Sequence, residues 1–218
     1  TRSGRQGMTA TRIDRTRRKI LSAAGKLFLK DGFSGTSMDE VASTAGVSKQ
    51  TVYAHFGAKE TLFVAVVHDM TGAAGDRVQE QVVDPAGDRE AEDFLLEFAT
   101  RQLAIVMTPP LMQLRRLVIA EVDRFPELGR ALYDQGPGRS TRLLSRAFTA
   151  YAEAGSLSVR DPEMAASYFN WLIMGAPVND AMLLGDASIP APATMEAHAR
   201  EAVRIFLAAY GTAPRKAG

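Results

Sequence analysis

Residues 37–63 read SMDEVASTAGVSKQTVYAHFGAKETLF and contain two short helical patterns separated by a turn at residues 45–47. Apolar side chains of the first pattern recur at the i, i+3, i+4, i+7 spacing of an amphipathic helix. They are Met38, Val41, Ala42 and Ala45.

Both short helices carry local start and stop signals. Ser37 followed by Glu40 fits a capping box, in which the hydroxyl accepts from the third helical N–H and the glutamate reaches back. Gly46 fits a left-handed helix stop, which glycine occupies without strain. Ser48 is a favourable N-cap for the second helix.

The second helix is expected to bury Val47 and Val52 and to leave its polar residues outward or at the rim. These polar residues are Lys49, Gln50, Thr51, Tyr53 and His55. Two short helices joined by a tight glycine-containing turn form a helix-turn-helix, whose second helix fits the major groove of DNA. Lys can contact guanine, Gln can contact adenine, and a Thr methyl can touch thymine.

Many residues at fixed spacing in this region resemble the DNA-binding domain of the TetR repressor family. The resemblance runs from about Ile20 to Phe63. It rests on Gly32-Phe33, Thr36-Ser37, Val41-Ala42, Ala45-Gly46-Val47-Ser48, Thr51-Val52-Tyr53, His55-Phe56, Lys59-Glu60 and Leu62-Phe63.

The resemblance implies roles for individual residues. Base contacts are expected from Lys49, Gln50 and Thr51, and phosphate contacts from Thr36, Tyr53, His55 and Lys59. Alternatively, Tyr53 and His55 are ordinary residues at the rim of the core, and Thr36 only shapes the turn beside the Ser37 cap.

Positive charge is concentrated at the start of the chain. Residues 1–60 contain eleven Lys/Arg against five Asp/Glu, a net charge of +6, whereas residues 61–218 carry −5, so a polyanion partner is indicated for the first part. Residues 1–10 are predicted to be a flexible basic arm that reaches the minor groove through Arg2 and Arg5 or, alternatively, a disordered tail.

The first helix is expected from about Thr11 to Lys30, with a stop at Asp31-Gly32. Five cations crowd its start: Arg12, Arg15, Arg17, Arg18 and Lys19. Positive charge opposes the dipole at a helix N-terminus, so phosphate attraction is favoured over a solvated basic face.

The remaining pattern predicts an all-α chain with a helix-turn-helix domain at 11–60 and a helical ligand-binding and dimerisation domain at 61–218. Further helices are expected at about 59–83, 111–124, 126–154, 162–184 and 192–210, and another is expected to begin after a cap at Asp88. Gly136-Pro137-Gly138 is a candidate break in the helix at 126–154. Pro177 is expected to kink its helix and to free a carbonyl near Ile173.

The segment from Leu117 to Leu184 resembles the AefR-like type of C-terminal domain. TetR-type proteins pair their last two long helices with those of a second subunit, which implies a homodimer on a palindromic operator in double-stranded DNA. The interface is predicted at Leu172, Gly175, Ala176, Met182, Val203 and Phe206.

An effector pocket is expected between helices of the domain at 61–218, because apolar and Met-rich walls suit small hydrophobic ligands. The candidates are Phe94, Phe98, Met107, Met112, Leu117, Trp171 and Met174. The alternative for each is plain core, and Trp171 also fits a dimer anchor.

Other chemistry is not indicated. The chain has no cysteine, its three histidines are far apart in sequence, and no Gly-x-Ser-x-Gly motif occurs, so we predict no metal, no cofactor and no enzyme. Without an apolar leader or a long apolar run, a cytoplasmic protein that does not enter membranes is expected. The sequence thus predicts a repressor released by a small hydrophobic effector; the alternative is a ligand-independent dimeric regulator controlled by a protein partner.

Overall fold

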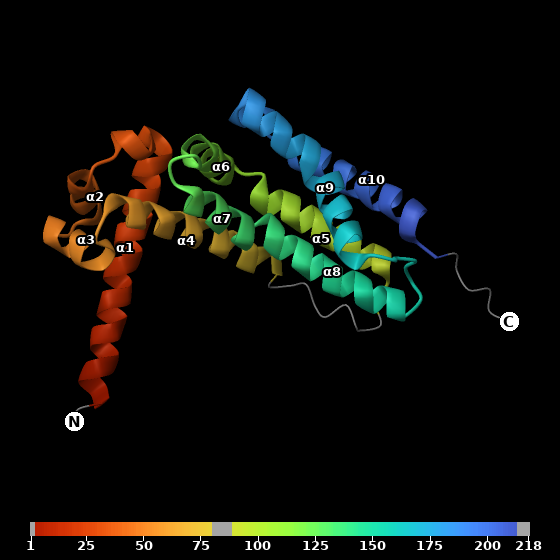
Figure 1. Ribbon diagram of the computed structural model, residues 1–218, viewed down its shortest axis with the longest axis horizontal. Coiled ribbons are helices and arrows are strands. Elements are labelled where there is room, and N and C mark those ends of the chain that lie inside the picture. Colours follow the sequence, from red (N-terminus) through yellow and green to blue (C-terminus); the bar gives the residue numbers. More distant parts are fainter. Residues whose placement is uncertain (1–2, 80–88, 213–218) are drawn as a thin grey trace. The chain divides into compact units, whose positions relative to one another are not determined.

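The computed structural model describes residues 3–79 and 89–212, with side chains described from residue 13 onward (Figure 1). The described chain is helical, with one isolated β-bridge between Leu157 and Gly211, which confirms the predicted all-α class. It divides into two compact units. Unit 1 comprises residues 1–70 and 117–131, and unit 2 comprises residues 71–116 and 132–218.

Unit 1 contains α1 (Ser3–Gly35), α2 (Met38–Ala45), α3 (Lys49–Phe56) and the first part of α4 (Lys59–Gln79). Unit 2 contains the rest of α4 and most of the remaining helices. These are α5 (Ala91–Val106), α6 (Pro109–Glu121), α7 (Pro126–Gln135), α8 (Pro137–Glu153), α9 (Pro162–Leu184), the short 3₁₀ helix η1 (Asp186–Ser188) and α10 (Pro192–Tyr210). Parts of α6 and α7 belong to unit 1, because residues 117–131 group with it.

The first helix begins at Ser3 rather than Thr11, so the predicted boundary was wrong. A helix extends cheaply once it is nucleated, and Gln6, Met8 and Ala10 favour its continuation. Arg2 and the side chain of Arg5 lie outside the described residues, so the minor-groove role remains a prediction. The expected stop is confirmed, since Gly32 leaves helical geometry at φ 74°.

Aromatic rings fill the core of unit 1. The Phe63 ring lies 4.8 Å from that of Phe28 and 5.2 Å from that of Phe33, measured between centroids. Phe125 contacts Phe33 edge-on at 4.9 Å. This cluster fixes α1, α4 and residue 125 around the two short helices.

The core of unit 2 joins α5, α8, α9 and α10, which run beside one another in Figure 1. Phe206 of α10 contacts Phe148 at 4.9 Å and Phe169 at 4.8 Å between ring centroids. Val203 and Phe206 are 2% and 1% exposed in this core. Their predicted place in a dimer interface is therefore corrected: the apolar stripe of α10 packs within its own chain.

Several predicted boundaries are confirmed. The last two long helices occupy 162–184 and 192–210, and the pattern expected at 126–154 breaks at Gly136. The α5 N-cap is Glu90, and the predicted Asp88 cap lies outside the described residues. No single described helix is long and apolar enough to span a membrane; α5 and α6 pass that test only together, as a pair bent by 73°.

Pro177 lies inside α9, where it cannot donate to the carbonyl of Ile173, four residues earlier. That carbonyl is 2.9 Å from His198 Nε2 of α10. Because a carbonyl only accepts, Nε2 carries the proton in this contact. The predicted free carbonyl is thus satisfied by a neighbouring helix.

Candidate functional site

The α2–turn–α3 segment is held by local hydrogen bonds. Ser37 accepts from the Glu40 N–H at 3.2 Å, and the Glu40 carboxylate accepts from the Ser37 N–H at 2.8 Å, which is the predicted capping box. The Ser37 hydroxyl and N–H both hold the pKa of Glu40 below its usual value. Gly46 ends α2 with φ 66°, and Ser48 caps α3 by accepting from the Thr51 N–H at 3.1 Å.

The outer surface of α3 carries the predicted base-contacting residues. Gln50 is exposed, and the Thr51 hydroxyl is hydrogen-bonded to Ser48 at 2.8 Å, which commits the oxygen locally. Lys49 pairs with Asp39 at 2.9 Å, and this carboxylate raises the pKa of the lysine. Because both side chains are more than half exposed, Lys49 readily exchanges Asp39 for another anion.

Tyr53 and His55 follow on the same helix. Tyr53 is 43% exposed and His55 is half-buried beside Phe56, whereas Val52 and Phe56 are buried. Arg17 of α1 lies over the Phe56 ring at 4.6 Å from its centroid. The helix therefore buries one narrow stripe and presents a broad polar surface.

Two predicted phosphate contacts have partners within unit 1. The Thr36 side chain is 2% exposed and donates to the Gly32 carbonyl at 2.9 Å, so its predicted side-chain contact with phosphate is corrected in favour of turn formation. The Lys59 ammonium donates to the carbonyls of Phe33 and Thr36 at 2.8 and 2.9 Å. One of its three N–H groups remains for a phosphate.

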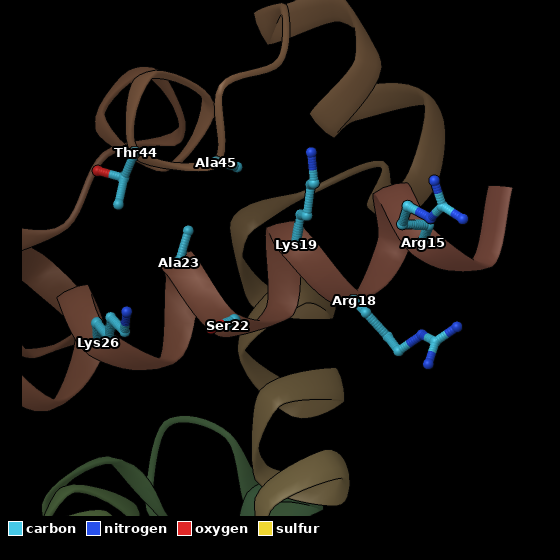
Figure 2. Close-up of a pocket in the computed structure, with 8 residues that line it drawn as sticks. All are labelled: Arg15, Arg18, Lys19, Ser22, Ala23, Lys26, Thr44 and Ala45. Atoms are coloured by element: carbon cyan, nitrogen blue, oxygen red, sulfur yellow. The ribbon is translucent and has the colours of Figure 1, made fainter. Parts of the chain in front are cut away.

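A basic groove runs between α1 and the end of α2. It has a volume of about 560 Å³ and is lined by Arg15, Arg18, Lys19, Ser22, Ala23, Lys26, Thr44 and Ala45. Figure 2 shows Lys19 and Ala23 on the side of α1 nearest Thr44 and Ala45, with Arg18 directed away from α2. Arg15 and Lys19 are like charges at i, i+4, which destabilises an isolated helix.

Among the described residues none of the four cations of this groove forms an ion pair. No carboxylate among the described residues therefore contacts these four cations. This surface attracts a polyanion.

Unit 2 contains a separate cavity of about 210 Å³. Side chains from α4, α5, α6, α7, α8 and α9 line it, from Thr71 to Val178 in sequence. Its apolar wall includes Val78, Val106 and Leu111, and its polar lining includes Gln102, Arg115 and Asn170.

The predicted pocket residues separate into two groups. Met112, Trp171 and Met174 line the cavity. The other four do not: Phe94, Phe98 and Met107 are buried in the core of unit 2, and Leu117 belongs to unit 1. The plain-core alternative holds for the two phenylalanines and Met107, because their rings and thioether fill the space between α5 and its neighbours.

Sequence reasoning missed most of the polar lining. Gln102, Arg115 and Asn170 lie on three different helices and share no local motif. A polar residue inside an apolar helical stripe was the available signal for Gln102 and Asn170, which are 3% and 7% exposed.

An exposed apolar stripe follows α9. Met164, Tyr168 and Trp171 are 51%, 52% and 64% exposed, and Leu183 and Leu184 are exposed still further. Of the predicted interface residues, Ala176 is exposed, while Leu172, Gly175 and Met182 are half-buried. In the described part of the chain, no cluster of three or more His, Cys, Asp or Glu residues is placed to hold a metal.

Two family models match the chain. Residues 20–66 match the model for bacterial regulatory proteins of the tetR family, and residues 93–212 match the AefR-like transcriptional repressor C-terminal domain. This chain belongs to the TetR family. The fold, the helix-turn-helix and the type of C-terminal domain predicted from the sequence are thereby confirmed, and the chain is a DNA-binding transcriptional regulator rather than an enzyme.

Solved structures of relatives extend over almost the whole chain. A TetR-family regulator from Mesorhizobium loti is 38% identical, with a TM-score of 0.86 over 92% of this chain and 99% of that one. The flavonoid-responsive regulator FrrA is 30% identical, with a TM-score of 0.74 over 93% and 100%.

A shorter match is found to the transcriptional repressor NicS of Pseudomonas putida. It is 33% identical over 92 residues, which cover 42% of this TetR-family chain and 43% of NicS. The chain thus spans less than half the length of this curated relative.

Proposed function

We propose that this TetR-family chain is a homodimeric repressor that binds a palindromic operator through α3 and leaves it when a small hydrophobic effector enters the cavity of unit 2. The proposed DNA binding rests on one observation, the exposed polar surface of α3. Ser37 caps α2 and Ser48 caps α3, which holds that surface in place. The model for an AefR-like repressor domain and the repressor NicS support repression.

Within unit 1 the proposed contacts divide by chemistry. Lys49, Gln50 and the Thr51 methyl read base edges, because they lie on the open side of α3. Tyr53, His55 and the remaining Lys59 N–H contact phosphate, which positions the helix without giving sequence preference. Cations of α1 in the basic groove make further phosphate contacts, in addition to those made by α3.

The cavity supports effector control over the ligand-independent alternative. Its lining combines methionine and aliphatic side chains with a few polar groups, as small-molecule sites do. FrrA, whose match covers 93% of this chain, is by its name a flavonoid-responsive regulator. A cavity ligand acts on DNA binding only if it prefers one arrangement of the dimer.

The test of base reading replaces Gln50 with alanine. We expect Gln50→Ala to weaken operator binding by about 1–3 kcal/mol and to leave random-sequence binding nearly unchanged. Fluorescence anisotropy on the two labelled duplexes measures this, with the operator obtained by selection from random duplexes. Equal losses on both duplexes would assign Gln50 to the backbone and remove base reading by this residue.

We propose that the exposed stripe of α9 pairs with its copy in a second subunit. Two recognition helices would then meet half-sites one DNA turn, roughly 34–36 Å, or a longer spacing apart. Ala176→Glu places a charge on this stripe at an exposed position, so the fold tolerates it. Sedimentation should show a monomer, with operator binding lost at normal concentrations.

The matched control is Ala104→Glu, which adds the same charge at an exposed alanine of α5. It should remain dimeric and bind the operator. A dimeric Ala176→Glu variant would exclude this stripe as the interface, and a wild-type monomer that binds one half-site tightly would exclude the dimer itself.

A further inference from the structure

Two neighbouring arginines of α6 differ in their surroundings. The Arg116 guanidinium contacts Asp186 Oδ1 at 2.5 Å and donates to the Ala181 carbonyl at 2.8 Å. Arg115 lines the cavity and has no hydrogen bond or ion pair with any described residue. Arg116 is therefore held by two partners within unit 2, whereas Arg115, the residue before it, has none among the described residues.

The environment of Arg115 makes this lack of a partner costly. Methionine and aliphatic side chains form much of the same wall, among them Met112, Met174 and Val78. Burial lowers the pKa of Arg115, although arginine remains charged at neutral pH. Arg115 is half-buried, and a cation partly withdrawn from water without an anion is unfavourable. A carboxylate in the cavity lowers that penalty through a bidentate contact.

A second polar feature lines the same cavity. Gln102 of α5 donates from Nε2 to Asn170 Oδ1 of α9 at 2.9 Å, and both side chains are lining residues. The Gln102 Oε1 atom is buried and has no hydrogen-bond partner among the described residues. A ligand hydroxyl both donates and accepts, so it matches this amide pair in either orientation of the amides.

We propose that the cavity of unit 2 binds a small amphiphilic acid, whose carboxylate pairs with Arg115 and whose hydroxyl meets the Gln102–Asn170 amide pair. The volume of about 210 Å³ lies below the roughly 300–1,000 Å³ of sites for drug-sized ligands, which favours a single ring. The Trp171 ring and the apolar wall supply contacts for an aromatic body. This inference rests on the proposed effector control and specifies the effector's chemical class.

The chain offers a direct readout of binding, because its one tryptophan lines the cavity. The probes are benzoate, cinnamate and phenylpropionate, each with and without a 4-hydroxyl group and each also as its methyl ester. Trp171 fluorescence and calorimetry give their dissociation constants. For the wild type we expect the hydroxylated acids to bind at least about tenfold more tightly than their esters, because a charge-assisted bond is lost in the ester.

Arg115→Gln should abolish the preference for acid over ester while leaving ester binding nearly unchanged. Arg146→Gln is the matched control, since it removes the same charge from an exposed position that does not line the cavity, and it should retain the preference. Gln102→Leu should reduce the advantage of a hydroxylated acid over its unsubstituted counterpart and retain the advantage of acid over ester.

Equal binding of acids and esters to the wild type, or a preference that survives Arg115→Gln, would overturn the proposal. So would the absence of binding by every acid at millimolar concentration. Operator release by an ester without an acid preference would overturn the assignment of Arg115 and leave effector control standing. Acid binding that depends on Arg115 but never releases the operator would support the site and contradict the proposed effector control.

Discussion

The recognition surface of α3 and the cavity of unit 2 are built in opposite ways. The α3 surface consists of consecutive residues. Ser37 caps α2 and Ser48 caps α3, and each serine accepts from an N–H three residues later. The cavity collects side chains from six helices, between Thr71 and Val178. A surface made by neighbours in sequence depends on local bonds, whereas a cavity made by distant residues depends on contacts between helices.

The largest loss of folding stability is expected at a contact between two residues of unit 2 that are distant in sequence. In His198→Ala the Ile173 carbonyl, already without a helical partner because of Pro177, loses its remaining hydrogen bond. Leaving a buried acceptor unpaired costs about 1–3 kcal/mol. Urea unfolding should show that loss, whereas His68→Ala, at an exposed position of α4, should stay close to the wild type. A His198→Ala variant as stable as wild type would show that water replaces the imidazole.

A smaller loss is expected at a local contact of unit 1. Ser48→Ala removes the α3 cap and the partner of the Thr51 hydroxyl, and an N-cap contributes about 1 kcal/mol. We expect weaker operator binding as α3 frays, measured by anisotropy, together with lower helicity by circular dichroism. Ser43→Ala, at an exposed position inside α2, is the control. Unchanged DNA affinity in Ser48→Ala would show that DNA itself supplies the missing cap.

The smallest effect depends on pH. Hydrogen bonds from Arg116 and Gln113 hold the pKa of Asp186 below its usual 3.8. A lowered folded pKa contributes stability above the unfolded pKa, and that stability is lost as pH falls through the folded value. Because the pair is about a third exposed, Asp186→Asn should cost only about 0.5 kcal/mol at pH 7.

Thermal unfolding at several pH values measures the contribution of Asp186. The difference from wild type should shrink as pH falls from about 5 toward and below 3.8, and Asp180→Asn, at an exposed position of α9, should show no such trend. A difference that is constant with pH would assign the loss to packing rather than to the carboxylate.

The same contrast explains what the sequence predicts well. Ser37, Glu40, Gly46 and Ser48 act through neighbours three or four residues away, so their spacing in the sequence is enough to identify their roles. The last two helices were also predicted to the residue, because proline opens each of them. Local chemistry of this kind can be interpreted without coordinates.

Predictions failed where the partner of a residue lies far away in sequence. Phe94 has the pattern of a pocket residue, but it is buried against Tyr151, with the two ring centroids 5.7 Å apart. Phe206 has the pattern of an interface residue, but Phe148 and Phe169 of its own chain cover it. An apolar stripe shows that a helix is buried and does not show against what.

The central claim is that occupancy of the unit 2 cavity controls the DNA affinity of α3. The most direct measurement titrates 4-hydroxycinnamate into wild-type protein bound to its labelled operator while following DNA anisotropy and Trp171 fluorescence together. The account predicts that both signals change with the same midpoint, and that Arg115→Gln binds the operator as wild type does but needs at least about tenfold more acid for release. Saturation of the Trp171 signal with no loss of operator affinity would contradict it.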